Sequence, residues 1–192
     1  MKQKVMEKGT RRSDVTRQRI LLAAREAFAT LGYERATVRK IAEMAEIHPS
    51  MVMRYFSSKE GLFTASSPFE IGLRDLSRFP PEEMGRALVE IFLDRWEKDG
   101  VAGDLPALLR LSVTHPDGRS KVIEVFTTQI APGIMKISRA KDPAKSAALV
   151  ATQVVGIAFL RYVVRLPAVV RMRREELVDE VGATLQRYLD GQ

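Results

Sequence analysis

Apolar residues recur at helical spacing along the first third of the chain. In residues 16–31 the repeat falls on Ile20, Ala24, Ala27, Phe28 and Leu31. Intervals of three and four residues place these side chains on one face of a helix. Ser13 or Asp14 can cap its start, and Gly32 can end it in a left-handed conformation. We therefore predict a long amphipathic helix between these points.

Two shorter helices joined by a tight turn are predicted next. Thr37 is a good N-cap for the first of them. Its inward-facing positions are Val38, Ile41, Ala42 and Ala45. After the turn Glu46-Ile47-His48, Pro49 suits the first position of a helix that runs to about Tyr55, because its missing N–H would have no partner there. This order is a helix-turn-helix, which presents one helix to the DNA major groove.

A fourth helix should follow directly, because Ser57 and Glu60 have the spacing of a capping box. The remaining chain is also expected to be helical, which makes the fold all-α. Prolines and glycines divide it into predicted helices near residues 69–77, 82–98, 104–114, 117–138, 144–165 and 174–189. No stretch alternates apolar and polar residues long enough to predict a strand. Pro132-Gly133 should kink or break the helix over 117–138.

Positive charge is concentrated in the N-terminal third. Residues 1–64 hold 13 lysines and arginines against 7 acidic residues, a net charge of +6, whereas residues 65–192 hold 18 against 17, a net charge of +1. Phosphate binding requires such an excess, although a solvated basic face is the alternative. We expect a disordered basic arm over 1–13, a DNA-binding domain over 14–64 and a larger helical domain over 65–192.

Composition narrows the possible classes of protein. The chain has no cysteine, which excludes disulfides and thiolate metal sites and suits a reducing cytoplasm; we expect no metal and no cofactor. The N-terminus is charged without an apolar core, unlike a signal peptide. The longest apolar run, 147–160, contains Gln153 and is too short to span a bilayer. An enzyme is not favoured, because the chain has only 2 histidines and no recognisable catalytic motif.

The helix-turn-helix region resembles the DNA-binding domain of the tetracycline-repressor (TetR) family. The resemblance rests on Ile20-Leu21-x-Ala23-Ala24, Phe28, Gly32-Tyr33, Thr37-Val38-x-x-Ile41-Ala42, Ala45 and Tyr55-Phe56-x-x-Lys59-Glu60-x-Leu62. It implies a homodimeric transcriptional regulator on a palindromic double-stranded DNA operator, most commonly a ligand-released repressor. An activator, or a helical scaffold whose helix-turn-helix binds protein, stays open as an alternative.

The resemblance also implies which residues contact DNA. The N–H groups of the helix after Thr37 can hold a phosphate. The positions that can touch DNA are Arg39, His48, Pro49, Ser50, Met51, Met53 and Arg54, with Tyr55 and Lys59 on the phosphates. Arg39 and Arg54 can each donate two hydrogen bonds to a guanine, which is the strongest contact for reading sequence.

Several of these residues have structural alternatives. Arg54 can be a solvated charge, His48 a cap of the turn, and Met53 a core residue. Two positions also depart from the family. Glu46 stands where the family commonly has glycine, which leaves a different turn open, and Met53 stands where an aromatic hydroxyl donor is frequent.

The larger domain is expected to dimerise through 144–165 and 174–189 and, by the same resemblance, to bind a small apolar or anionic effector. The helix over 144–165 has small residues at Ala147, Ala151 and Ala158. The helix over 174–189 carries an apolar stripe of Leu177, Val181, Leu185 and Leu189. Candidate effector contacts are Phe92, Trp96, Leu108, Leu111, His115, Phe126, Phe159 and Arg161. The alternative for the apolar ones is an ordinary core, whereas Arg161 can pair with an acid, face solvent or bind an anion.

Overall fold

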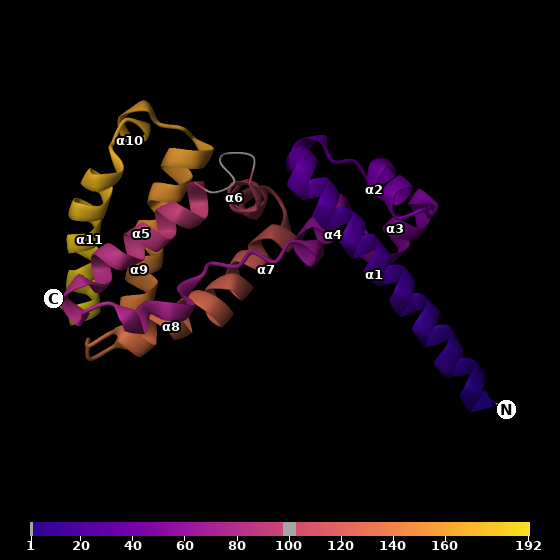
Figure 1. Ribbon diagram of the computed structural model, residues 1–192, viewed down its shortest axis with the longest axis horizontal. Helices are drawn as coiled ribbons and strands as arrows, with labels where there is room; N and C mark the ends of the chain where they lie inside the picture. The colour runs from indigo at the N-terminus through magenta and orange to yellow at the C-terminus, as the bar shows by residue number, and fades with distance from the viewer. Residues whose placement is uncertain (1, 98–102) are drawn as a thin grey trace. The chain divides into compact units, whose positions relative to one another are not determined.

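The computed structural model describes residues 2–97 and 103–192 (Figure 1). Within these ranges the regular elements are all helical, which confirms the predicted all-α fold. The chain divides into two compact units, Met1–Pro68 and Phe69–Gln192. Each unit has a hydrophobic core of its own.

The N-terminal unit consists of α1 (Lys2–Arg35), α2 (Val38–Met44), α3 (Pro49–Phe56) and α4 (Lys59–Ser66). Helix α1 begins at Lys2, so the structure has helix over 2–13 where the sequence indicates a disordered arm, and neither Ser13 nor Asp14 caps it. The stretch is proline-free and contains three lysines and two arginines, which are good helix formers. Gly32 does interrupt the helix, with φ 74° and ψ 164°.

The core of this unit joins α1 to the three shorter helices. Ile20, Ile41 and Val52 are fully buried. The rings of Phe28 and Phe63 meet edge to face with centroids 5.0 Å apart. Such aromatic contacts add to the hydrophobic stabilisation. The apolar face predicted for α1 is therefore the face against which the helix-turn-helix packs.

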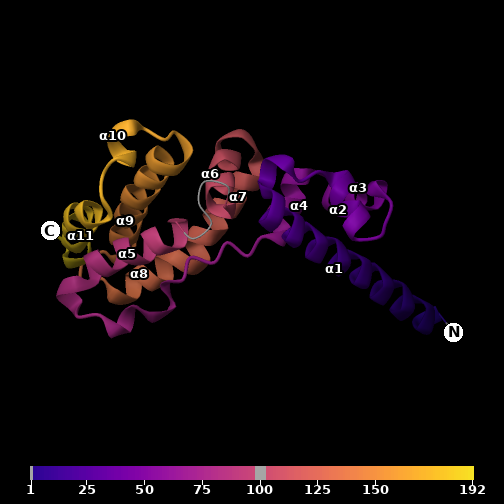
Figure 2. The ribbon, with the colours of Figure 1, turned by 45° about the horizontal axis from the view of Figure 1, so that its top comes forward.

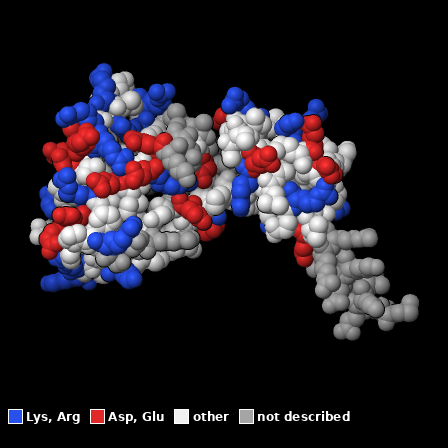
Figure 3. Space-filling view, in the orientation of Figure 1, with Lys and Arg blue, Asp and Glu red and all other residues white. Residues whose placement is uncertain are grey.

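The C-terminal unit is a helical bundle. Its elements are η1 (Leu73–Arg78), η2 (Pro81–Glu83), α5 (Met84–Glu97), α6 (Asp104–Thr114), α7 (Pro116–Val125), η4 (Phe126–Ile130), α8 (Ala131–Ile137), α9 (Pro143–Ala158), η5 (Phe159–Val163), α10 (Pro167–Val170) and α11 (Arg174–Asp190). Helices α5, α9 and α11 lie side by side in both views (Figure 1, Figure 2). Basic and acidic side chains are interspersed on the visible face of this unit (Figure 3).

Two predicted helices are modified by local backbone geometry. The prediction of a helix over 69–77 is wrong. Phe69 and Gly72 have φ of 44° and 81°, outside the helical region, and only a 3-10 helix begins at Leu73. The helix expected over 117–138 continues through a π-helical turn, η4, in which the Ala131 N–H bonds to the Phe126 carbonyl. This wider turn lies directly before Pro132, where a regular turn would collide with the proline ring.

Helices α5 and α11 approach each other closely at Gly85 and Gly182. A Cβ on Gly85 would overlap the Gly182 carbonyl oxygen and lie 2.7 Å from the Gln186 backbone nitrogen. The Gln186 side chain accepts from the Gly85 N–H at 2.9 Å and donates to the Pro81 carbonyl at 3.0 Å. The two helices thus pack backbone against backbone at this point.

The leucine stripe of α11 faces into its own subunit. Leu177, Leu185 and Leu189 are at most 3% exposed, since α11 packs on α5 and α9. Helix α9 and the η5 turn that continues it are different, because Val155 of α9 and Leu160 of η5 are 39% and 38% exposed. A Cβ on Gly156 would have open space around it. The expectation that the leucine stripe itself forms the dimer contact is not supported by this burial, whereas one face of α9 is left apolar and open.

The segment Pro143–Val163 forms a continuous helix of 21 residues with mean hydropathy 1.5 in its most apolar window. This length is enough to cross a membrane, contrary to the estimate from the apolar run alone. Only 28% of that window is buried within the unit. Length and composition are weak indicators for one helix, because a helix that packs in a protein interface has the same composition.

The connection between the units is bonded on both sides of Pro68. In the N-terminal unit, Arg25 donates from Nε to the Ser66 carbonyl at 3.1 Å. In the C-terminal unit, the Phe69 side chain is fully buried. Arg95 donates to the Glu70 carbonyl at 2.6 Å, and Gln129 accepts from the Ile71 N–H at 3.1 Å.

Candidate nucleic-acid interface

Helices α2 and α3 begin with side-chain caps that fix their first turns. Thr37 accepts from the Lys40 N–H through its hydroxyl at 3.1 Å, which confirms the predicted cap. His48 caps α3, because its Nδ1 accepts from the Ser50 N–H at 3.3 Å and lies 2.7 Å from the Ser50 hydroxyl. Because first-turn N–H groups have no partner one full turn earlier in their own helix, those left unpaired here are potential phosphate donors.

Helix α3 divides into a buried and an exposed face. Val52 and Phe56 are buried against the unit, as predicted. Ser50, Met53 and Arg54 are exposed, with Met53 at 43% exposure, whereas Pro49 and Met51 are half-buried. Met53 is thus a surface residue rather than part of the core. The exposed side chains combine hydrogen-bond donors with apolar groups that can contact thymine methyls.

Tyr55 is held between α3 and α1. Its hydroxyl lies 3.1 Å from the Ser13 hydroxyl, and this hydrogen bond lowers the pKa of the Tyr55 phenol. The Arg54 guanidinium lies over the Tyr55 ring, 5.6 Å from its centroid. The ring of Tyr55 is half-buried and its polar end is near the surface, where a phosphate could reach it.

The start of α4 differs from the predicted capping box of Ser57 and Glu60. Ser58 rather than Ser57 is the cap of α4, accepting from the Gly61 N–H at 2.9 Å. Glu60 instead accepts from the Tyr33 hydroxyl at 2.8 Å. Lys59 donates to the Glu34 carbonyl at 3.3 Å, with its ammonium 4.4 Å from the Tyr33 ring centroid. Lys59 therefore ties α4 to the end of α1 as well as being a candidate phosphate contact.

The turn between α2 and α3 keeps a left-handed residue although it lacks glycine. Glu46 has φ 52°. The Arg19 guanidinium, from α1, donates through Nη2 to the Ala45 carbonyl at 2.6 Å and to the Glu46 carboxylate at 3.2 Å. Sequence reasoning missed Arg19, because the 26 residues that separate it from Ala45 hide the contact.

On α2, Arg39 is exposed. Its neighbour Lys40 pairs with Glu43 at 3.1 Å. The structure thus brings the candidate contacts on α2 and α3 together on one small helical unit, at the surface or half-buried. Within the described ranges no three histidine or acidic side chains gather as metal ligands would.

The comparisons with known proteins match both units. Residues 20–65 match the model of bacterial regulatory proteins of the tetR family, and residues 82–189 match that of the tetracyclin repressor-like C-terminal domain. The chain belongs to the TetR family. The two matches together cover both the helix-turn-helix and most of the helical bundle.

Two curated TetR-type regulators share sequence with the chain. It is 47% identical over 45 residues to the HTH-type transcriptional regulator TcmR of Streptomyces glaucescens, a match covering 23% of the chain and 20% of that protein. It is 37% identical over 78 residues to the repressor AcnR of Corynebacterium diphtheriae, covering 41% of the chain and 38% of that protein. The matched parts therefore span well under half of these relatives.

Solved structures share the fold over nearly the whole chain. A TetR-family regulator from Streptomyces coelicolor A3 is 24% identical, with a TM-score of 0.56, and the alignment covers 91% of this chain and 94% of that one. The multidrug binding protein EbrR, solved with proflavin, is 16% identical, with a TM-score of 0.63, and the alignment covers 90% and 99%. At these identities the likeness establishes the fold alone.

The candidate effector residues of this TetR-family bundle are mostly in its core. Phe92, Trp96, Leu108 and Leu111 are buried, and Phe126 and Phe159 are half-buried. The Trp96 ring stacks on the buried Tyr162 ring with centroids 5.3 Å apart. His115 caps α7, accepting from the Asp117 N–H at 3.2 Å. A cavity of about 550 Å³ is instead lined by Arg139, Lys141, Lys145, Ser146, Tyr188 and Asp190, among others.

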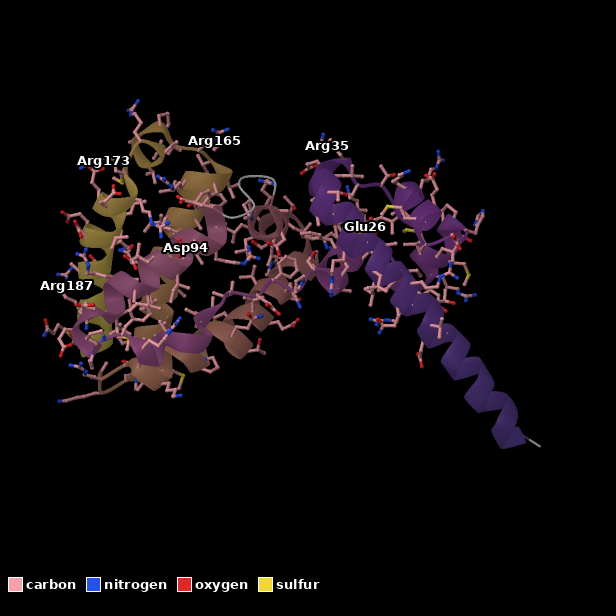
Figure 4. The ribbon with its side chains drawn as sticks, in the orientation of Figure 1. Glu26, Arg35, Asp94, Arg165, Arg173 and Arg187 are labelled. Carbon is pink, nitrogen blue, oxygen red and sulfur yellow. The ribbon has the colours of Figure 1, made fainter. Side chains whose placement is uncertain are left out.

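Arg161 pairs with an acid, one of the three alternatives. Its guanidinium lies 3.5 Å from the Glu97 carboxylate. It also donates to the carbonyls of Val169, Val170 and Met172 at 2.8, 3.2 and 3.1 Å. Beside it, Arg174 donates to Asp94, which is labelled in Figure 4, at 2.6 Å. Arg161 therefore binds carbonyls at the C-terminal end of α10 and connects this helix to Glu97 at the end of α5.

Proposed function

We propose that the protein is a DNA-binding transcriptional repressor of the cytoplasm that reads a palindromic operator with α3. The observation that carries the proposal is the division of α3: Val52 and Phe56 are buried, while Ser50, Met53 and Arg54 project from the surface. A packed helix that exposes donors and apolar groups on one side has what base-edge recognition requires. Arg39 on α2 and Tyr55 and Lys59 at the ends of α3 and α4 are the accompanying contacts.

The repressor is proposed to act as a homodimer through α9 and the outer face of α11. A single helix-turn-helix makes few contacts, so two are paired on two half-sites. The exposed residues Ala148, Val155 and Gly156 of α9, with Leu160 of η5, form the surface that a second copy would cover. Burial in a dimer, rather than insertion in a membrane, suits this helix because its last turn carries Arg161, which is bonded to Glu97 and to carbonyls of α10.

A small effector is proposed to bind the C-terminal unit and release DNA. The support is the size of this unit and the aromatic group of Phe92, Trp96 and Tyr162 next to the charged cluster of Glu97 and Arg161. Proteins of the same fold have been solved with proflavin and with choline, so a small organic molecule is the class we propose. Release would follow if the effector prefers an arrangement of the recognition helices that does not fit two half-sites.

A gel-shift series on DNA from upstream of the protein's own gene tests this function. Specific retention at low salt should fall steeply as salt rises, because binding releases counterions from the phosphates. Sedimentation at micromolar concentration tests the dimer. Failure to retain DNA even at low salt would favour a protein-binding scaffold instead, and increased transcription from a bound promoter would favour an activator.

A further inference from the structure

The contact of Arg19 with the helix-turn-helix turn joins three parts of the N-terminal unit. Arg19 is on α1, Ala45 is the C-cap of α2, and Glu46 is the turn residue before α3. One nitrogen of the guanidinium, Nη2, donates to both the Ala45 carbonyl and the Glu46 carboxylate. The same side chain therefore holds the end of α2 and the charge of the turn.

The turn between α2 and α3 contains a residue in an unfavourable conformation and a helix-end carbonyl that requires a hydrogen-bond donor, and Arg19 contacts both. A left-handed conformation is unfavourable for a residue with a Cβ, and Glu46 adopts it with φ 52°. The last carbonyls of a helix also lack intrahelical partners, and Arg19 supplies one for Ala45. The turn sets where α3 begins, so a change in it would move every exposed side chain of the recognition helix.

The charge of Glu46 gives the contact a second effect. The Glu46 side chain is 85% exposed, next to a helix proposed to approach phosphates. An unpaired carboxylate there would repel DNA. The Arg19 side chain, 47% exposed, pairs with it from the side of α1. The ion pair contributes little to stability at such exposure, so its effect should appear in DNA binding more than in folding.

We propose that Arg19 is a positioning residue for DNA recognition: it fixes the α2–α3 turn and neutralises Glu46, which replaces the need for glycine at that position. The inference rests on the proposed DNA-binding function. It implies that Arg19 and Glu46 are energetically coupled in DNA affinity. Loss of the arginine harms binding because the glutamate is present, and not because the arginine itself contacts DNA.

A double-mutant cycle tests this coupling. The probes are the duplex that the wild-type protein selects from a random library and a random-sequence duplex. Arg19→Gln should weaken binding to the selected duplex about tenfold, which equals 1.4 kcal/mol. Glu46→Gly should bind within about twofold of wild type, and Arg19→Gln combined with Glu46→Gly should recover to within about twofold of Glu46→Gly alone.

Arg25→Gln is the matched control. Arg25 is also on α1 and also donates to a backbone carbonyl, that of Ser66, but it does not touch the turn. Glu46→Gly should leave any effect of Arg25→Gln unchanged. Melting temperatures measured on all variants separate affinity from folding.

The outcomes distinguish the inference from the function on which it rests. If the wild-type protein binds neither duplex, the proposed function fails. If the wild type binds and Arg19→Gln binds equally well, the positioning role is refuted. An affinity loss that Glu46→Gly does not restore would also overturn it, since Arg19 would then act directly on DNA or only on folding.

Discussion

Replacing Gly85 by alanine should strongly destabilise the C-terminal unit. The added Cβ would overlap the Gly182 carbonyl oxygen and lie 2.7 Å from the Gln186 backbone nitrogen. Both neighbours are backbone atoms of α11, so relief requires the two helices to separate. Separation would stretch the bond between the Gly85 N–H and the Gln186 side chain, now 2.9 Å long.

The magnitude follows from two opposing effects. Alanine is about 1 kcal/mol better than glycine inside a helix, whereas overpacking a filled site costs about 1–3 kcal/mol and sometimes more. Because the colliding atoms are main-chain atoms, we expect the upper end of that cost, about 3 kcal/mol, which leaves a net loss of about 2 kcal/mol after the gain from alanine. For a protein of this size that corresponds to a fall in melting temperature of about 4–8 °C.

Thermal unfolding followed by circular dichroism measures this loss. Gly133→Ala is the matched control, because Gly133 is also in a helix but its added Cβ would lie 3.6 Å from Leu73, an ordinary contact. The control should be neutral or slightly stabilising. If Gly85→Ala melts within about 2 °C of the control and with about the same unfolding enthalpy, the backbone-to-backbone packing of α5 and α11 is refuted.

Three further predictions concern DNA, assembly and pH. Arg54→Ala should cost about 1–3 kcal/mol on the selected duplex if the arginine binds guanine, and an equal loss on random DNA in a filter-binding assay would reject base readout. Val155→Arg should convert the proposed dimer to a monomer in sedimentation while keeping the melting profile cooperative, because Val155 is 39% exposed in one subunit; an unchanged dimer would place the interface elsewhere. Burial and the nearby Glu97 carboxylate raise the pKa of Tyr162 to about 12. The stability from its protonated form is therefore fully present below about pH 10 and is lost as the pH rises through 12. Urea unfolding should show that the free energy of unfolding falls less between about pH 10 and pH 12 in Tyr162→Phe than in the wild type. If this free energy depends on pH in the same way in both proteins, the raised pKa of Tyr162 is contradicted.

The local signals of the helix-turn-helix were sufficient to predict its helices. Thr37 and Pro49 act within one turn of their own positions, so the start of α2 and of α3 could be located from sequence. The long α1 could not be delimited, because Ser13 is a good cap that the continuing helix does not use. A cap residue indicates where a helix can begin, not that it does.

Contacts between distant residues were beyond sequence reasoning. The α11 stripe ending at Leu189 indicated burial but not whether its own subunit or a partner buries it. Arg161 was given three alternatives, of which the structure shows pairing with an acid, but its three carbonyl acceptors lie in or just after a short helix, α10, that was not predicted. Arg19 was missed because its reach across the turn depends on how α1 packs on α2.

The bonded connection between the two units has a consequence for building hybrid regulators. Ser66 is secured to α1 by Arg25, and Phe69 to Ile71 are secured to the bundle by burial and by Arg95 and Gln129. Only Ser67 and Pro68 separate these two sets of contacts along the chain. A chimaera whose donor DNA-binding half continued beyond Pro68 would therefore place a foreign residue in the buried Phe69 site. Splicing after Gly72 would break the same contacts, unless the receiving bundle supplied matching partners for them. Exchange of DNA specificity between such proteins is thus expected to succeed when the donor half ends at Pro68 and this chain resumes at Phe69.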